Sequence, residues 1–230
     1  MMSSRAEPNR YLQRQEQPLS NALPEQAPSY PVAFDVEPQL RNRNRLTTAF
    51  RLILGVPHIL IIGGVGVGFG SGGIRGSGAL SAAAFVMAII AWFAIVFTGE
   101  HPRGLWDFAA YYMRWRVRAG AYLALLRDDY PPFGDGEYPT TYQVDYPVGD
   151  RNRVSVGLRL IYVIPHAFVL IFVNIAWLVT SVIAWFAILF TGAYPESLYR
   201  FGVGAMRWNV RVESYVLLMR DEYPPFRLAQ

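Results

Sequence analysis

The hydrophobic pattern begins with two apolar stretches separated by a glycine-rich segment. Residues 46–67 and 79–98 are each long enough to cross a hydrocarbon core of about 30 Å, because a helix rises about 1.5 Å per residue. The segment Gly63–Gly78 between them is rich in glycine and serine, which predicts a flexible connection. This part of the chain therefore predicts a transmembrane hairpin.

A second apolar region, residues 154–190, contains no charged residue or histidine other than Arg159 and His166. A single helix of this length would be roughly 55 Å long, well beyond the thickness of a bilayer. We therefore expect two short spans, about 154–173 and 176–190, joined by a tight turn near Val173–Ala176. A re-entrant hairpin is the alternative, because each half is barely long enough to cross.

An amphipathic segment follows each apolar region, at residues 102–127 and 195–220. Apolar and aromatic side chains recur every three or four positions in both segments, which places them on one helix face. Arginines flank this face, so we expect both helices to lie in the membrane interface. Packing of the same face against the rest of the protein or a partner is the alternative. Tyr-Pro-Pro-Phe follows each segment and predicts its end, because two prolines do not continue a helix.

These features occur twice because the chain repeats itself. Trp92–Gly99 and Trp185–Gly192 are nearly identical at an offset of 93, and the amphipathic segments keep this offset. Pro57-His58 matches Pro165-His166 at an offset of 108, so the first copy carries 15 extra residues between its two spans. The glycine-rich segment is the natural insertion. We expect tandem repeats at residues 30–133 and 142–230, with a linker at 134–141.

The N-terminal region differs in character from the repeats. Residues 1–29 hold few large apolar residues, so we expect a disordered tail. Residues 30–36 alternate between apolar and polar positions, and residues 144–148 do so more loosely. This period of two predicts a short extended segment that opens each copy.

Composition and charge support a membrane location. The chain is 53% hydrophobic and 17% charged, against about 25% charged in an average soluble domain. Arginines flank both hairpins, and the positive-inside rule then places both termini and both amphipathic helices in the cytoplasm. We expect an all-α, multi-pass protein of the cytoplasmic membrane with four transmembrane helices and no cleaved signal peptide. Its two repeats would be related by a pseudo-two-fold axis along the membrane normal.

Two intramembrane pairs are the conspicuous candidates for chemistry: Arg51 with His58, and Arg159 with His166. Titratable groups inside a span are costly, so each is a functional hypothesis. In one interpretation the arginines extend to the headgroups and the histidines satisfy backbone groups freed by the adjacent prolines. In a second, the arginines bind lipid phosphate. In a third, the histidines converge on the pseudo-axis to bind a metal or haem, or to relay protons.

Candidate contacts for lipid headgroups or a partner combine these arginines with the basic clusters and the arginine-tryptophan pairs of the helices. They are Arg43, Arg45, Arg51, Arg114, Trp115, Arg118, Arg151, Arg153, Arg159, Arg207, Trp208 and Arg211. The acidic pairs Asp128-Asp129 and Asp221-Glu222 are expected to be solvated helix ends. The sequence contains no cysteine and no catalytic motif, and it predicts no cofactor, no metal and no nucleic-acid partner.

The repeated phrases resemble a family of bacterial integral membrane proteins, common in actinobacteria, that is known as a domain of unknown function. The resemblance rests on the Arg-Asn-Arg entry, Pro-His, Trp-Phe-x-x-x-Phe-Thr-Gly, Arg-Trp and the Tyr-Pro-Pro-Phe exit, and it covers roughly residues 30–227. It implies a multi-span membrane protein without an established activity.

We therefore expect a non-enzymatic accessory or scaffold subunit. It would bind anionic lipid headgroups, a membrane protein or a second copy through its amphipathic helices. A small transporter or channel subunit with paired histidines, and a lipid-modifying enzyme, are the alternatives.

Overall fold

The computed structural model describes residues 30–63 and 78–229. The predicted tail at residues 1–29 lies outside the described residues. In chain order the elements are β1 (Val32–Val36), α1 (Arg45–Ala49), α2 (Arg51–Ile62), α3 (Ala79–Thr98), α4 (Arg103–Leu123), β2 (Thr140–Val144), α5 (Arg153–Gly157), α6 (Arg159–Thr191) and α7 (Glu196–Val216).

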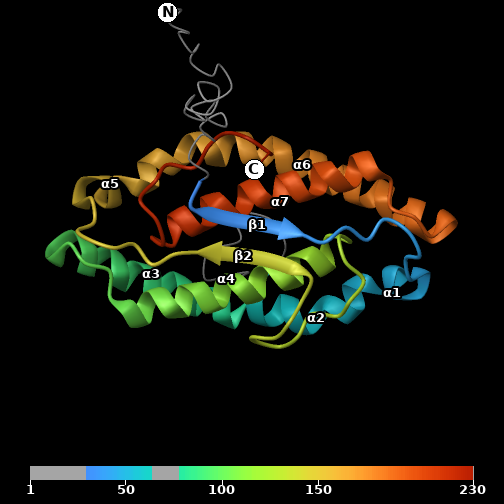
Figure 1. Cartoon of the computed structure of the whole chain (residues 1–230), viewed down its shortest axis with the longest axis horizontal. Helices are drawn as coiled ribbons and strands as arrows, with labels where there is room; N and C mark the ends of the chain where they lie inside the picture. The colour runs from blue at the N-terminus through green and yellow to red at the C-terminus, as the bar shows by residue number, and fades with distance from the viewer. Residues whose placement is uncertain (1–29, 64–77, 230) are drawn as a thin grey trace, which may run out of the picture.

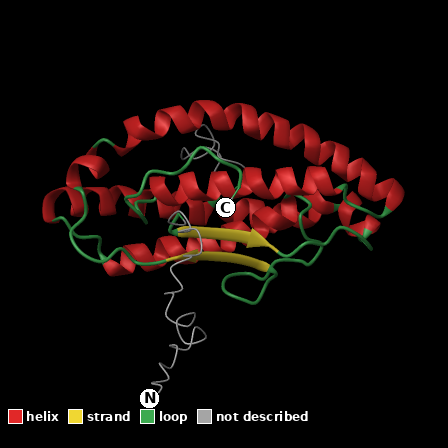
Figure 2. Cartoon of the chain, turned by 45° about the horizontal axis from the view of Figure 1, so that its top comes forward, coloured by secondary structure: helices red, strands yellow, loops and turns green. Residues whose placement is uncertain are grey.

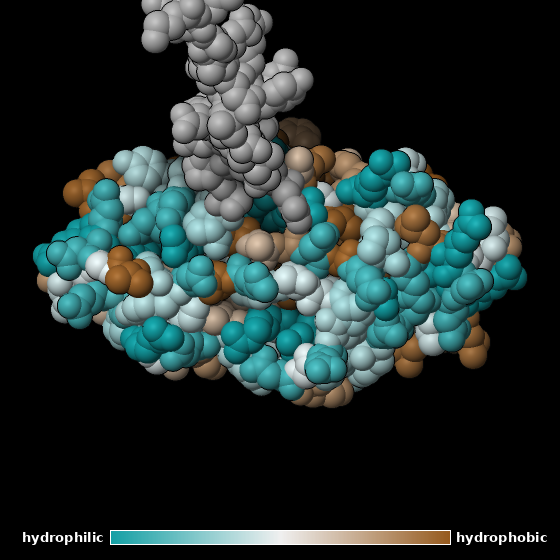
Figure 3. Space-filling view, viewed as in Figure 1, coloured by the Kyte–Doolittle hydropathy of each residue, from teal (hydrophilic) through white to brown (hydrophobic). Residues whose placement is uncertain are grey.

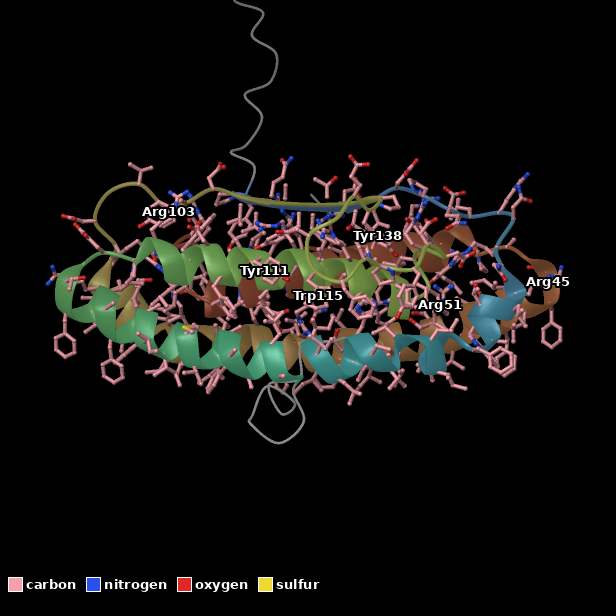
Figure 4. The ribbon with its side chains drawn as sticks, turned by 90° about the horizontal axis from the view of Figure 1, so that it is seen from below. Arg45, Arg51, Arg103, Tyr111, Trp115 and Tyr138 are labelled. Carbon is pink, nitrogen blue, oxygen red and sulfur yellow. The ribbon has the colours of Figure 1, made fainter. Side chains whose placement is uncertain are left out.

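These elements form a flat slab of three layers (Figures 1 and 4). The ribbon of β1 and β2 covers one face, α4 and α7 form the middle layer, and α1–α3 with α5–α6 form the other face. The main core lies between the layers, where buried side chains of the middle helices meet both the ribbon and the outer helices. Because all three layers run along the long axis, each face of the slab extends over the length of the molecule (Figure 2).

Helix α6 corrects the predicted second hairpin. Residues Arg159–Thr191 form one continuous helix of 33 residues, so the turn predicted near Val173–Ala176 is wrong. The helix stays continuous because α7 packs along it, and the side chains of Asn174 and Asn209 exchange hydrogen bonds of 3.2 and 2.9 Å midway. A helical hairpin would not need α7 to pack along the whole length of residues 159–191. Tertiary packing, which the apolar run does not reveal, decides between the two.

Helices α2 and α3 are the interrupted counterpart of α6. Position 171 of α6 corresponds to Gly63 at an offset of 108 and to Gly78 at an offset of 93. The backbones of Gly63 and Gly78 lie against each other, with no space for a Cβ atom on Gly78. Helices α2 and α3 therefore correspond to one long helix that is interrupted at these two glycines, as predicted for an insertion. Residues 64–77 themselves lie outside the described residues.

Four transmembrane helices are not supported by this architecture. Among the described residues, two helices, α3 and α6, are long and apolar enough to cross a membrane. Only 17% of each apolar window is buried inside the protein, whereas the core helix of a soluble protein would be mostly buried. The two helices therefore expose apolar surface.

The amphipathic segments form helices α4 and α7, as predicted, but they end at Leu123 and Val216 rather than at 127 and 220. Their predicted position at the membrane interface is wrong. Their aromatic faces are buried in the middle layer, so the alternative of packing within the protein holds. The chain leaves each helix through a leucine with positive φ, Leu125 at 64° and Leu218 at 62°, several residues before the Pro-Pro pair.

The ribbon corrects the expectation of an all-α fold. Strand β1 was predicted, and Val32, Phe34 and Val36 are buried on one face. The second strand lies at Thr140–Val144, partly inside the predicted linker, rather than at 144–148. The strands pair antiparallel, and Phe34 faces Tyr142, its own equivalent at an offset of 108. A pseudo-two-fold axis therefore passes through this pair and relates the two halves by a half-turn about the viewing direction of Figure 1.

Each half also clasps the end of the other. Gly99 and Gly192 end α3 and α6 with φ of 84° and 72°, a left-handed conformation that glycine adopts without strain. The carbonyl oxygen of Gly192 accepts from the Arg43 N–H at 3.0 Å, and that of Gly99 accepts from the Arg151 N–H at 2.9 Å. The two predicted repeats thus interlock at both ends of the slab.

Candidate functional site

The first polar cluster is centred on Asp128, at the exit from α4. Arg43 and Arg51 both donate to its Oδ1 at 2.7 and 2.6 Å, and the Asn44 N–H donates to Oδ2 at 2.8 Å. Arg43 also donates to the carbonyl oxygen of Leu125 at 2.6 Å, which the positive φ of that leucine turns toward it. Both arginine side chains are almost fully buried. Contrary to the prediction, they are therefore not available to contact lipid headgroups.

The second cluster repeats the first around Asp221. Arg151 and Arg159 each donate to Oδ1 at 2.6 Å, and Arg151 also donates to the carbonyl oxygen of Leu218 at 2.8 Å. Burial alone would raise the pKa of Asp221, but hydrogen bonds and charge from Arg151 and Arg159 outweigh it and hold the pKa below its ordinary value. The pKa of Asp128 is lowered in the same balance.

These aspartates were expected to be solvated helix ends, and the structure corrects that expectation. The side chain of Asp128 is 9% exposed and that of Asp221 is 27% exposed. One feature of the sequence distinguishes these buried aspartates from the acidic residue that follows each of them. At an offset of 93 an aspartate recurs at this position, whereas the next residue changes from Asp129 to Glu222.

Each histidine that was predicted to lie inside the membrane, His58 and His166, is enclosed by aromatic rings of its own half. His58 is fully buried, stacks on Phe133 at 4.6 Å between ring centroids, and accepts a 3.1 Å hydrogen bond at Nδ1 from Trp115 Nε1. His166 stacks on Phe226 at 3.9 Å and accepts at 3.1 Å from Trp208.

Tyr130 and Tyr223 complete the two enclosures, so the Tyr-Pro-Pro-Phe sequences cover the histidines rather than end the helices. The histidines do not face each other on the pseudo-axis.

The tryptophan contacts fix the tautomer of both histidines. An indole N–H can only donate, so Nδ1 is the acceptor and the hydrogen of the neutral ring sits on Nε2. The Pro131 and Pro224 carbonyls lie near the rings, yet Nε2 completes no hydrogen bond within the described residues. A ring in this state offers no lone pair to a metal, and the described residues contain no group of three or more His, Asp or Glu that could hold one.

Four of the seven arginines of the middle helices contact the ribbon side and its neighbouring loops. Arg114 forms a two-pronged ion pair with Asp135, and Arg118 donates to the Gly134 carbonyl oxygen at 2.8 Å. Arg207 donates to the Phe34 carbonyl oxygen at 3.0 Å. Arg211 donates to carbonyl oxygens of the C-terminal segment. They tie loops to the slab and, like Trp115 and Trp208, they do not form a lipid-binding helix surface.

Arg45 and Arg153 lie at opposite ends of the slab, beside the terminal glycines of α6 and α3. Both side chains are exposed. Arg153 donates to the Thr98 carbonyl oxygen at 2.9 Å. Arg45 lies against Gly192, with its Nε 3.4 Å from where a Cβ atom would stand. Of the predicted contact residues, these two are the ones that the structure leaves on an exposed surface at the ends of the outer helices.

A continuous apolar face lies on α1–α3 and α5–α6. Its exposed residues include Leu52, Phe93, Phe97, Phe168 and Phe190, with exposed fractions from 51% to 76%. Figure 4 shows side chains of the outer helices that project away from the ribbon along the lower edge of the molecule. The opposite face, seen in Figure 3, is mostly hydrophilic with scattered apolar residues. Monomeric soluble proteins rarely expose an apolar patch of this extent.

The fold and these sites define a mostly helical protein with a continuous apolar face. Two segments, residues 77–134 and 153–227, match the family model described as Domain of unknown function (DUF4389). Together they cover more than half of the chain, which therefore belongs to this family. Each segment holds one long outer helix (α3 or α6), one middle helix (α4 or α7) and one Tyr-Pro-Pro-Phe sequence, consistent with a domain present twice. Comparisons with curated proteins and with solved structures give no match.

Proposed function

We propose that the protein is a monotopic membrane protein that lies flat in one leaflet and serves as a non-enzymatic scaffold. Helices α1–α3 and α5–α6 are immersed by their apolar face, and the ribbon faces water. The observation that carries this proposal is the segregation of exposed apolar side chains onto one face along the whole slab (Figure 4).

The length of α6 favours this orientation over a transmembrane one. Its 33 residues extend about 50 Å, whereas a hydrocarbon core is about 30 Å thick. Lying in the plane of the membrane, the helix buries one apolar face and needs no match to the bilayer thickness. The predicted pseudo-axis along the membrane normal is compatible with this position, because it runs across the thin dimension of the slab.

The charges of the ribbon side give a second reason. If α6 crossed the bilayer, the middle helices and the ribbon would cross with it, because the three layers run side by side. Ion pairs such as Arg114 with Asp135 and Arg207 with Asp35 would then enter the hydrocarbon. Each charged side chain costs about 2.5–3.5 kcal/mol at the bilayer centre. Burying a Leu, Ile or Phe in the leaflet instead contributes about 1.5–3 kcal/mol.

The scaffold role follows from what each face offers. The apolar face provides anchorage, and the hydrophilic ribbon face, with an open cavity of about 450 Å³ beside Tyr30 and Arg114, remains available to a partner. The middle helices are not that partner surface, because their aromatic faces are buried. The enclosed histidines argue against the alternative of a channel with paired histidines on its axis.

Cysteine labelling from one side of a membrane tests the orientation. The sequence has no cysteine, so Arg103→Cys and Glu196→Cys each introduce a single thiol. These residues are the first of α4 and α7, lie at opposite ends of the slab, and have side chains 65% and 62% exposed. In sealed vesicles of uniform orientation, we expect an impermeant maleimide to label both variants from the same side and to the same extent.

An Asp145→Cys variant on the exposed ribbon side provides the reference for a water-facing thiol. Labelling after detergent solubilisation gives the total of reactive thiols in each sample. If Arg103→Cys reacts only from one side and Glu196→Cys only from the other, the slab crosses the membrane and the proposal is wrong.

A further inference from the structure

A basic cavity of about 380 Å³ opens at the end of the slab where α1 meets the last turn of α6. Arg41, Asn42, Arg43 and Arg45 line one side of it, and residues 191–193 line the other. Figure 4 shows Arg45 at this end, between the apolar helices and the ribbon. The cavity therefore lies at the height where the headgroup region would surround a slab immersed by its apolar face.

Two of the lining arginines are free to bind a ligand. The side chains of Arg41 and Arg45 form no hydrogen bond or ion pair with any described residue. Arg43, by contrast, is occupied by Asp128 and by backbone carbonyl oxygens. Its buried contacts hold the floor of the cavity in place while its two neighbours present their guanidinium groups.

The rim of the cavity on the membrane side is apolar. Leu46 on α1, next in the chain to Arg45, is 69% exposed, Phe50 at the C-terminal cap of α1 is 50% exposed, and Phe190 on α6, next to Thr191, is 76% exposed. A ligand that touched both the arginines and this rim would need a negative group attached to an apolar body.

The opposite end of the slab supplies a comparison within the same molecule. At an offset of 108, Arg41 and Asn42 become Gly149 and Asp150, and at an offset of 93, Ala193 corresponds to Glu100. The remaining arginine, Arg153, already donates to the Thr98 carbonyl oxygen at 2.9 Å. One end of the slab thus carries two unpaired arginines, whereas the equivalent positions at the other end carry one hydrogen-bonded arginine and two carboxylates.

We infer that the cavity between Arg41, Arg45 and residues 191–193 binds the phosphate of an anionic lipid headgroup, at one end of the slab only. Guanidinium groups form charge-assisted hydrogen bonds with phosphate oxygens, and the apolar rim contacts the acyl chains of the same lipid. This inference rests on the proposed in-plane position, because only that position brings the cavity to headgroup height.

Vesicle binding with a charge-matched control tests the inference. The full chain is titrated with vesicles of phosphatidylcholine alone and of phosphatidylcholine mixed with phosphatidylglycerol. A basic side chain near an anionic surface contributes about fivefold in affinity. We expect Arg41→Gln with Arg45→Gln to weaken binding to the mixed vesicles roughly 25-fold, by the same estimate for two residues, and to leave binding to phosphatidylcholine unchanged.

The control variant, Arg103→Gln with Arg200→Gln, removes the same charge from two exposed arginines that already pair with neighbouring carboxylates. We expect it to lose less than threefold, in keeping with the small contribution of exposed ion pairs. If both double variants lost affinity equally, binding would depend on total positive charge and not on this cavity, and the inference would be overturned. Tight binding of soluble glycerol phosphate to the cavity without a membrane would also overturn it, because the ligand would then not be a lipid.

The outcomes separate this inference from the proposed function. Wild-type protein that fails to bind even phosphatidylcholine vesicles contradicts the in-plane position. Protein that binds them, yet shows no phosphatidylglycerol preference sensitive to Arg41 and Arg45, contradicts only the lipid site.

Discussion

The two halves of the molecule share their buried contacts and differ at their ends. Asp128 and Asp221 each join two buried arginines, and His58 and His166 each accept from a tryptophan and stack on a phenylalanine. At the surface the halves diverge. One end carries unpaired arginines, the other carries carboxylates, and the outer helix is continuous in one half and interrupted in the other.

This difference separates residues that hold the slab together from residues that can serve a ligand. A contact that recurs in both halves satisfies a requirement of the shared fold. A surface that occurs in one half alone is free of that requirement, and the basic cavity is the clearest case. The comparison predicts that equivalent substitutions at buried positions of the two halves have similar effects on stability. Any difference between them should follow the difference in exposure of the two side chains.

The largest effect is expected at the buried aspartates. Asp128→Ala leaves Arg43 and Arg51 without their carboxylate, and loss of one partner of a buried ion pair costs about 3–5 kcal/mol. Asp221→Ala should cost less, because its carboxylate is 27% exposed rather than 9%. Denaturant unfolding in detergent micelles measures both. Asp129→Ala, which removes an exposed ion pair, is the control at about 0–1 kcal/mol; a similar loss there would refute the ranking.

The same clusters predict an acid-sensitive stability. The pKa values of Asp128 and Asp221 are lower in the folded protein than their ordinary value of 3.8. The unfolded chain therefore takes up protons first as the pH falls, and the stabilisation present above about pH 4 is lost as the pH falls through the folded pKa values. Unfolding measured as a function of pH should show this decline in the wild type, and a weaker one in Asp128→Asn. Identical declines in both proteins would argue against the assignment.

A medium effect is expected at the tryptophans that bond the histidines. Trp115→Phe and Trp208→Phe each leave a buried imidazole Nδ1 without its donor, at a cost of about 1–3 kcal/mol. Because the enclosures are alike, the two losses should be similar, and because they are separate sites, the losses should add within about 0.5 kcal/mol in the double variant.

Nitrogen NMR of the wild type should find the hydrogen on Nε2 in both rings. Hydrogen on Nδ1 would contradict the assigned bond. Adding His58→Leu to Trp115→Phe removes both partners and should recover part of the loss.

The smallest effect is expected at the glycines that end the outer helices. Gly99→Ala and Gly192→Ala place a Cβ atom at positive φ, which costs about 1–2 kcal/mol. Gly99→Ala should be the worse of the two. Its Cβ atom would lie 2.9 Å from Arg153 Nη2, whereas that of Gly192 would lie 3.4 Å from Arg45. Thermal unfolding in micelles measures the order, and Gly104→Ala, in an open position on α4, serves as the control. A larger loss for Gly192→Ala would contradict this order, because it would show that the arginine side chains move aside from the new Cβ atom at little cost.

Local patterns predicted much of this fold. The 3-4 spacing located α4 and α7, the alternation located β1, and the two offsets located the interruption at Gly63 and Gly78. The features that were missed depend on partners distant in sequence. Asp128 meets Arg43 across 85 residues, so it looked like a solvated helix end. The run at 154–190 fits a hairpin and a long helix equally well until α7 packs along it.

The interfacial position assigned to the amphipathic helices failed for the same physical reason. An apolar-aromatic stripe has the same spacing whether it faces lipid or the protein core. Trp115 lies in the core because His58 and Phe133 supply its partners. In the proposed orientation, the more uniformly apolar helices α3 and α6, which were predicted to cross the bilayer, face the lipid instead.

The depth of α6 along its length tests the in-plane position most directly. Spin labels on single cysteines at Leu160, Ile175 and Phe190 sample the start, middle and end of the exposed face, at 72%, 56% and 76% exposure. In phosphatidylcholine bilayers, collision with oxygen and with a water-soluble nickel chelate reports the depth of each label. We expect one shallow depth for all three labels, since the helix lies parallel to the surface. A label at position 175 near the bilayer centre, with 160 and 190 near opposite surfaces, would contradict the account.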